Sequence, residues 1–187
     1  MTGKQTDDER LMQDVRAGEL AKLELLFDRH HPGLFRYFLS LTGNRAVSED
    51  LSQEVFFRIL KYRHTYNPGS GFRAWLYSVG RNVWADHMGK QKPEVALPEE
   101  AGELRGKETP PDRALQKKQE AQILRRALAS MPNEKREVLI LSRYQDMKYE
   151  EIARVLQCEV GTVKVRVYRA LRELSDRFFE LCGERAS

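Results

Sequence analysis

The chain has 187 residues, with 32 Lys and Arg against 28 Asp and Glu, a formal net charge of +4 and an apolar fraction of 41%. No apolar run reaches the ~20 residues that span a bilayer, and the polar, acidic residues 1–10 lack the apolar segment of a secretory signal. Two cysteines, Cys158 and Cys182, are too few for a disulfide framework, so the composition predicts a cytoplasmic protein and excludes secreted and membrane-spanning classes.

Residues 1–90 are predicted to form a first helical domain. Apolar side chains recur at helical spacing between residues 7 and 41. Gly18 and the pair Pro32–Gly33 lie within this stretch, and both are expected to interrupt a helix. The segment therefore predicts short helices separated by turns.

Ser48 is a suitable N-cap for a second helical stretch over residues 49–62, because its hydroxyl can accept a hydrogen bond from a free backbone N–H. Acidic residues follow in the first turn and basic residues come near the end, which suits the helix dipole. Residues 67–71 predict a loop, and residues 72–88 predict a third helix with one apolar stripe.

Residues 91–114 break every helical periodicity and carry most of the seven prolines. This composition predicts an extended, flexible linker between two domains. The segment is also rich in glutamate, which we expect either to mimic nucleic-acid charge or simply to keep the linker soluble; the glutamates are Glu99, Glu100, Glu103 and Glu108.

Residues 115–187 predict a second helical domain that ends in a helix-turn-helix. A short helix over 149–156 is followed by a turn at 157–160 and by a longer helix over 161–174. No segment shows the alternation of a β-strand. The predicted fold class is therefore all-α, with two small helical domains joined by a linker.

The basic excess of the chain gathers on the outer face of the last predicted helix. Two interpretations of this face stay open: a solvated helix surface, and a surface that contacts nucleic-acid phosphates. The pattern of a basic helical hairpin alone does not decide between a DNA-binding domain and a plain three-helix bundle.

The residue identities add a resemblance. Tyr149-x-Glu151-Ile-Ala153-x-x-Leu156 followed by Gly161-Thr-Val-Lys-x-Arg166-x-x-Arg169-Ala170, with Met131–Pro132 upstream, resembles region 4 of bacterial sigma factors of the extracytoplasmic-function type. The resemblance implies contacts to the −35 promoter element from Thr162, Lys164, Tyr168 and Arg169. Arg166 belongs to the same set, but it lies nearer the buried edge and is equally expected to contact a phosphate or to brace the helix. Val165 stands where the family often has serine, and a valine can contact a thymine methyl group.

A second motif, Ser48-Glu-Asp-Leu-Ser-Gln-Glu-Val-Phe56, resembles sigma region 2.2. Asp50, Gln53 and Glu54 are three and four residues apart and share a helix face. In the family, this face docks on the clamp of the β′ subunit of RNA polymerase, so the resemblance implies the same role for these three residues.

Residues 72–88 look like regions 2.3 and 2.4, which capture unpaired bases of the −10 element. The resemblance implies six contacts from this helix and the preceding loop: Asn67, Arg73, Tyr77, Arg81, Asn82 and His87. The family usually has basic residues soon after Asp86, and their replacement here weakens the expected phosphate contact at that point.

Together these motifs predict a non-enzymatic sigma factor that binds core RNA polymerase, through the β′ clamp and the β flap, and recognises promoter DNA. The resemblance also implies an anti-sigma factor as a partner. No cofactor and no metal site is expected, because phosphate-loop, serine-hydrolase and metal-ligand motifs are absent. The alternatives are a stand-alone helix-turn-helix regulator and, less favoured, a small helical enzyme.

Overall fold

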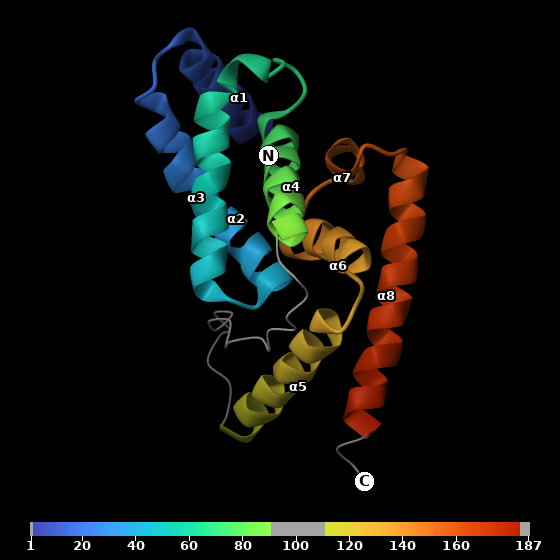
Figure 1. Cartoon of the computed structure of the whole chain (residues 1–187). Coiled ribbons are helices and arrows are strands. Elements are labelled where there is room, and N and C mark those ends of the chain that lie inside the picture. Colours follow the sequence, from blue (N-terminus) through green and yellow to red (C-terminus); the bar gives the residue numbers. More distant parts are fainter. Residues whose placement is uncertain (1, 91–110, 184–187) are drawn as a thin grey trace.

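The computed structural model describes residues 2–90 and 111–183, and these residues form helices and no strands (Figure 1). The first half contains four α-helices and a short 3-10 turn: α1 (Thr2–Ala17), α2 (Lys22–Thr42), α3 (Arg45–Lys61), η1 (Arg63–Thr65) and α4 (Phe72–Lys90). The second half contains α5 (Pro111–Ala129), α6 (Asn133–Leu139), the π-helical turn η2 (Ile140–Tyr144), α7 (Tyr149–Leu156) and α8 (Val160–Gly183). The predicted all-α class is confirmed for the described residues.

Most of the predicted linker lies outside the described residues, and so do its four glutamates, Glu99, Glu100, Glu103 and Glu108. Helix α5 begins at Pro111, a few residues before the predicted end of the linker. Proline is well tolerated in the first turn of a helix, because the missing N–H would have no partner there.

Helix α2 does not break at Pro32–Gly33, so this sequence prediction was wrong. Pro32 lies inside a continuous helix of 21 residues, although its ring removes one intrahelical hydrogen bond. Neighbouring helices hold the segment in place, since Leu26 and Leu34 on either side of Pro32 are fully buried. Tertiary packing outweighs the local cost of the proline here.

The start of α3 also differs from the prediction. Asn44, and not Ser48, is the N-cap: its extended backbone (φ −118°) allows its side chain to accept a hydrogen bond from the Val47 N–H. Ser48 lies one turn inside the helix, where its buried hydroxyl donates to the Asn44 carbonyl. Both residue types are good caps, so the choice was made by the turn that closes α2 at Gly43.

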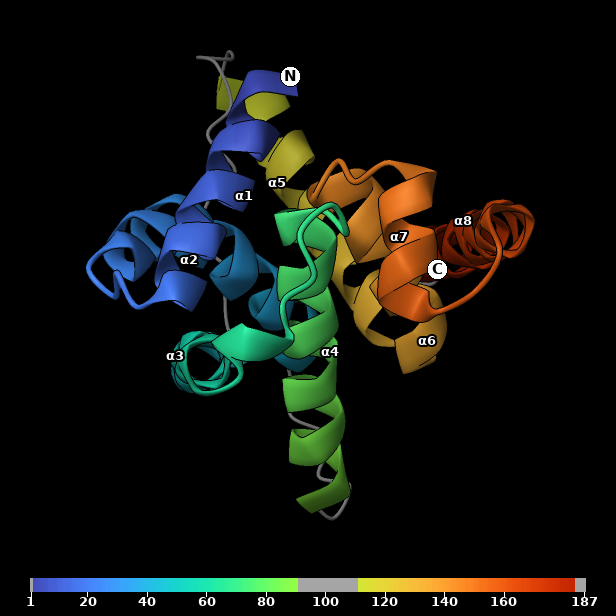
Figure 2. The same ribbon diagram turned by 90° about the horizontal axis from the view of Figure 1, so that it is seen from above.

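The buried apolar residues of both halves belong to one continuous cluster. Helices α2, α3 and α4 pack side by side, and α4 in turn lies against α7 (Figures 1 and 2). Helix α7 therefore sits between α4 and α8. This arrangement explains why α7 buries Val155 as well as Ile152, Ala153 and Leu156.

Candidate nucleic-acid interface

The outer face of α8 carries all five residues that were predicted for −35 recognition. Val163, Val167 and Ala170 anchor the opposite face of the helix, and each is at most 2% exposed. The five predicted residues are all exposed, namely Thr162, Lys164, Arg166, Tyr168 and Arg169. None of them makes an ion pair within the described part of the chain, so their donors face outward. The face offers both cationic groups for phosphates and polar groups for base edges.

Val165, which the sequence analysis named as able to contact a thymine methyl group, lies at the centre of this face. At about 100° per residue it points almost directly away from Val163 and Val167. Its side chain is 48% exposed, and the neighbouring Tyr168 is 67% exposed. An apolar group at this position is a candidate contact for a thymine methyl in the major groove.

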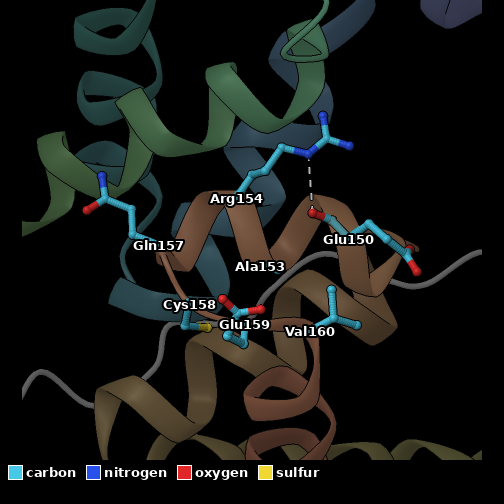
Figure 3. A pocket seen from close by; sticks show the side chains of 7 residues that line it. All are labelled: Glu150, Ala153, Arg154, Gln157, Cys158, Glu159 and Val160. Atoms are coloured by element: carbon cyan, nitrogen blue, oxygen red, sulfur yellow. Dashed lines mark hydrogen bonds between the residues drawn. The ribbon is translucent and has the colours of Figure 1, made fainter.

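The turn between α7 and α8 encloses a surface hollow of ≈ 560 Å³ (Figure 3). In this view Arg154 points away from Cys158 and toward α4 and its preceding loop. Its guanidinium donates to the carbonyl oxygens of Glu150, at 3.3 Å, and of Ser70. The Arg154 guanidinium is therefore bonded away from Cys158. Because a reactive thiol needs a cation nearby, this supports a structural role for the half-buried Cys158 in a tight turn.

The six residues predicted for −10 recognition do not form one surface. Arg73, Tyr77 and Arg81 follow one another at four-residue spacing along one stripe of α4. Tyr77 is only 3% exposed, so the prediction that it lies off the apolar side of the helix was wrong. The stripe faces the C-terminal half, and all three side chains are bonded there to Glu137 or Gln145.

The other three lie elsewhere on this part of the molecule. Asn67 is exposed in the loop before α4, where its carbonyl accepts hydrogen bonds from the backbone and side chain of Ser70. Asn82 is exposed on another side of the helix, and His87 stacks on Trp84 with ring centroids 5.7 Å apart. Asn67, Asn82 and His87 therefore remain accessible to a ligand, whereas the stripe of Arg73, Tyr77 and Arg81 does not.

The face of α3 that was predicted to bind the polymerase clamp is open to solvent. Asp50 and Gln53 are exposed, and Gln53 donates to the Glu49 carboxylate at 3.2 Å. Glu54 is half-buried and accepts a hydrogen bond from Arg58 at 2.7 Å; Arg58 also reaches Asp86 of α4. Two of the three predicted residues are therefore available, while the third pairs with Arg58, the residue that links α3 to α4.

Glu137 and Gln145 are the residues that the sequence analysis missed. Both are polar and yet at most 7% exposed. The one available signal was indirect: Glu137 stands among apolar residues in a helical run. Their partners come from a segment more than fifty residues away, which no local pattern reveals.

The described residues show no group of three or more His, Cys, Asp or Glu side chains that could hold a metal ion. None of their helices has the length and apolar character needed to cross a bilayer.

Comparison with known proteins matches both halves of the chain to one family. The model "Sigma-70 region 2" matches residues 26–94, and "Sigma-70, region 4" matches residues 121–174. The sigma factor EcfG of Rhodopseudomonas palustris is 35% identical over 144 residues, which are 77% of this chain and 78% of EcfG. SigE of Mycolicibacterium smegmatis is 30% identical over 164 residues, 86% of this chain, but the match spans only 63% of SigE.

Solved structures agree with the fold. The sigma factor RpoE from Bartonella quintana, solved with the anti-sigma factor NepR, superposes with a TM-score of 0.65 at 25% identity and covers 82% of this chain and 94% of that chain. CnrH, solved with the cytosolic domain of CnrY, gives a TM-score of 0.68 at 23% identity and covers 90% and 95%.

A stand-alone helix-turn-helix regulator would match region 4 alone, whereas this chain matches region 2 as well. The order of the two regions, the helical fold and the similarity to EcfG all lead to the same family. The chain therefore belongs to the extracytoplasmic-function group of the sigma-70 family, the factors that direct RNA polymerase to specific promoters.

Proposed function

We propose that this sigma factor docks on the β′ clamp of core RNA polymerase through the exposed face of α3, centred on Asp50 and Gln53. The observation that carries this proposal is the exposure of both side chains on a helix that matches region 2. A carboxylate and an amide oxygen accept hydrogen bonds from the arginines that the family's clamp supplies. Glu54 contributes mainly by holding Arg58 and so orienting the face.

The proposed promoter contacts lie on α8 and around α4. Exposed cationic and polar groups of α8 suit the −35 element, and the loop before α4 together with the open side chains of α4 suits the −10 element. Bases captured out of the duplex need polar edges and stacking faces, and the exposed Asn67 can supply a polar edge. Arg73 and the buried Tyr77 are bonded to Gln145 and can join only after these bonds break. Arg81, Asn82 and His87 extend this set along the helix.

Further partners follow from the same assignment. The β flap is proposed to bind the C-terminal half, where an apolar hollow of ≈ 510 Å³ between α5 and α8 is lined by Leu124, Leu171 and Phe178 among others. An anti-sigma factor is proposed as well, by analogy with the complex of RpoE and NepR. The chain is proposed to work in the bacterial cytoplasm, where RNA polymerase works, and to have no catalytic activity of its own.

The decisive test measures binding of the purified chain to core RNA polymerase. Replacing Asp50→Ala together with Gln53→Ala should weaken binding by about tenfold or more, because each lost charge-assisted bond contributes about 1.5–3 kcal/mol. Gln13→Ala with Glu19→Ala is the matched control, since it removes one amide and one carboxylate from exposed positions outside α3. Equal affinity of the test and control variants would reject the clamp assignment.

DNA reading is tested separately with the reconstituted holoenzyme. In vitro transcription on a promoter library identifies the recognised elements, and Arg169→Ala should then lower transcription from promoters that depend on a −35 element. Undiminished transcription by Arg169→Ala would remove this residue from the proposed contacts.

A further inference from the structure

The proposed docking face of α3 is connected to α2 by a short series of hydrogen bonds. The series joins three side chains, which we call the α2–α3 bridge: His31 of α2, Glu49 near the start of α3, and Gln53 one turn further along α3. Helices α2 and α3 pack side by side, which brings His31 to Glu49 across 18 positions of the sequence. Figure 1 shows α3 on the side of the N-terminal half away from α6 and α7. The bridge therefore ends on an open surface.

The ring of His31 is held between two phenylalanines of α2. Phe27 and Phe35 lie one turn before and one turn after it, because residues four apart share a helix face. Their ring centroids are 4.7 and 6.4 Å from that of His31, with interplanar angles of 24° and 26°. Phe27 also contacts Phe56 of α3, with ring centroids 4.8 Å apart. The stacking fixes the His31 ring, and its Nε2 is directed at Glu49.

Glu49 accepts two hydrogen bonds on one oxygen. Its Oε1 lies 3.0 Å from His31 Nε2 and 3.2 Å from Gln53 Nε2. A carboxylate can only accept hydrogen bonds, so both nitrogens are donors in this contact. The Glu49 side chain is 41% exposed, and packing alone would leave it free to change rotamer. The bond from the stacked His31 ring gives the carboxylate a defined position.

The bond to Glu49 decides which end of the Gln53 amide faces outward. A glutamine side chain has two N–H donors at one end of its amide and an oxygen acceptor at the other, and a free side chain can present either end. Because Nε2 of Gln53 is bonded to Glu49, Oε1 is directed away from Glu49. Asp50, exposed three residues earlier on the same face, also offers only acceptors. The docking face therefore combines a carboxylate with an amide oxygen.

We propose that Glu49, held by His31, is a positioning residue for polymerase docking: it fixes the Gln53 amide with its oxygen toward the partner. The inference rests on the proposed docking of this face on the clamp. The arrangement selects a partner group with donors and no acceptor, which is the chemistry of an arginine guanidinium. If the Gln53 amide were flipped, its N–H groups would meet the N–H groups of the guanidinium. Glu49 acts through Gln53 and does not itself touch the partner.

The α2–α3 bridge acts by ordering Gln53 before the partner arrives. Immobilising a flexible side chain at an interface lowers affinity by about two- to tenfold, and a side chain that is already ordered avoids this loss. Gln53 is exposed, so the bond to Glu49 has to supply the order that packing does not. His31 does the same for Glu49, one step further from the surface. We therefore expect the effects of substitution to decrease from Gln53 to Glu49 to His31.

The test is a double-mutant cycle on the affinity of the purified full chain for core RNA polymerase. Gln53→Ala should weaken binding about tenfold, and Glu49→Ala about threefold. When Gln53→Ala is already present, Glu49→Ala should have no further effect, because the amide that it positions is gone. Glu19→Ala is the matched control: it removes a carboxylate from an exposed position outside α3 and should leave the affinity unchanged.

Gln53→Glu separates a positioning role of Glu49 from a structural one. A carboxylate at position 53 has an acceptor at both ends, so it presents an oxygen to the partner whichever way it turns. It also carries a charge of the same sign as Glu49, four residues away on the helix. In the Gln53→Glu background, Glu49→Ala should therefore leave the affinity unchanged or raise it. A residue that only stabilised α3, or that touched the polymerase directly, would weaken binding in every background.

His31→Phe extends the test to α2. Phenylalanine keeps a ring between Phe27 and Phe35 but has no N–H to donate to Glu49. We expect about twofold weaker binding from His31→Phe in the otherwise unaltered chain, and no effect beside Glu49→Ala. Circular dichroism checks that each variant is folded. If Glu49→Ala does not fold, Glu49→Met takes its place, because methionine has a similar length and helix propensity but no acceptor oxygen.

Two results would overturn the positioning role while the docking assignment stands. One is a loss of affinity from Glu49→Ala that is the same in the unaltered, Gln53→Ala and Gln53→Glu backgrounds. The other is no loss from Glu49→Ala in a chain whose binding Gln53→Ala does weaken. If neither Asp50→Ala nor Gln53→Ala changes the affinity, the docking assignment itself fails, and the positioning role fails with it. The failure of the proposed function and that of this inference are therefore distinguishable.

Discussion

At the scale of single residues, Val165 shows that a helix face rich in cations can also carry an apolar contact. The exposed side of α8 is rich in cations, and Val165 lies in its centre at 48% exposure. Cationic side chains bind phosphates whatever the DNA sequence is. Recognition of particular bases must therefore come from side chains that differ between relatives. A valine in place of the serine frequent in the family exchanges a hydrogen bond for an apolar contact.

We predict that Val165 reads a thymine methyl in the −35 element. Replacing the contacted thymine by deoxyuracil should weaken promoter binding by the holoenzyme about fourfold, because a buried methyl group is worth about 0.8 kcal/mol. The measurement is binding to a promoter fragment with each −35 thymine replaced in turn. The Val165→Ala variant should show no such loss. Indifference of the unaltered protein to every replacement would contradict the contact.

At the scale of elements, helix ends and turns decide where functional side chains point. Asn44 starts α3 one turn earlier than the sequence suggested, and the burial of Leu51 and Val55 on the opposite face turns Asp50 and Gln53 outward. Likewise the π-helical turn at Ile140–Tyr144 and the left-handed backbone of Asp146 (φ 47°) bring Gln145 to α4. Such turns often mark functional positions in helices.

Because Asn44 caps α3, Asn44→Ala should lower the free energy of unfolding by about 1 kcal/mol. Asn44→Asp keeps a side-chain acceptor for the Val47 N–H and should remain close to the unaltered stability. Urea denaturation followed by circular dichroism measures both variants. Equal stability of the alanine and aspartate variants would show that the cap contributes little.

A second pair of elements, α1 and α2, is joined by the buried carboxylate of Asp8. Burial alone would raise the pKa of this carboxyl, but the hydrogen bond to His30, at 2.8 Å, and the contact with Arg29 outweigh it and lower the pKa. A lowered pKa in the folded state gives stability that is present above pH ~4 and lost as the pH falls through the folded value.

Acid unfolding therefore tests the junction of α1 and α2. Asp8→Asn should lower stability at pH 7 by about 1–3 kcal/mol, because His30 and Arg29 lose a charged partner. The deficit relative to the unaltered chain should shrink as the pH falls below 4, since the native carboxyl then becomes protonated as well. A deficit independent of pH would show that the charge of Asp8 is not the cause.

At the scale of the whole molecule, the contact between the N-terminal half and the segment from α6 to α7, which we call the interdomain interface, buries the hydroxyls of Tyr37 and Tyr77. Both hydroxyls must stay protonated. Burial raises the pKa of Tyr37 well above its usual value, and the neighbouring Glu137 carboxylate raises it further. Burial likewise raises the pKa of Tyr77. Both phenols donate hydrogen bonds across the interface, so ionisation of either one removes a contact.

Alkaline pH should consequently open the molecule. Because the pKa of each tyrosine is raised in the folded state, the interface is fully stable below the ordinary tyrosine pKa of ~10. Above that pH, each tyrosine lowers the stability of the interface by about 1.4 kcal/mol per pH unit. With dyes at Lys61→Cys and Glu180→Cys, two exposed positions on opposite halves, and with Cys158 and Cys182 replaced by serine, energy transfer should fall above pH 10. Tyr37→Phe should make the fall less steep. Constant transfer up to pH 12 in a chain that remains helical would contradict this assignment.

The amino-acid sequence by itself determined the all-α class, the two regions and the positions of α4 and α7 within a few residues, because apolar periodicity and turn residues act locally. It also determined the outer face of α8, since Val163, Val167 and Ala170 had to be buried. The motifs added the family, which the comparisons confirmed.

Only the tertiary structure decided the continuity of α2 through Pro32, the cap at Asn44 and the burial of Tyr77. Each depends on groups far away in the sequence. Packing around Leu34 holds the proline in the helix, and Gln145 accepts a hydrogen bond from the hydroxyl of Tyr77, which lies 68 positions earlier in the chain. Local patterns cannot encode such partners, because burial of a polar side chain is favourable only where the fold supplies its hydrogen bond. The interdomain interface, which covers a stripe predicted to bind DNA, is therefore a property of the folded molecule alone.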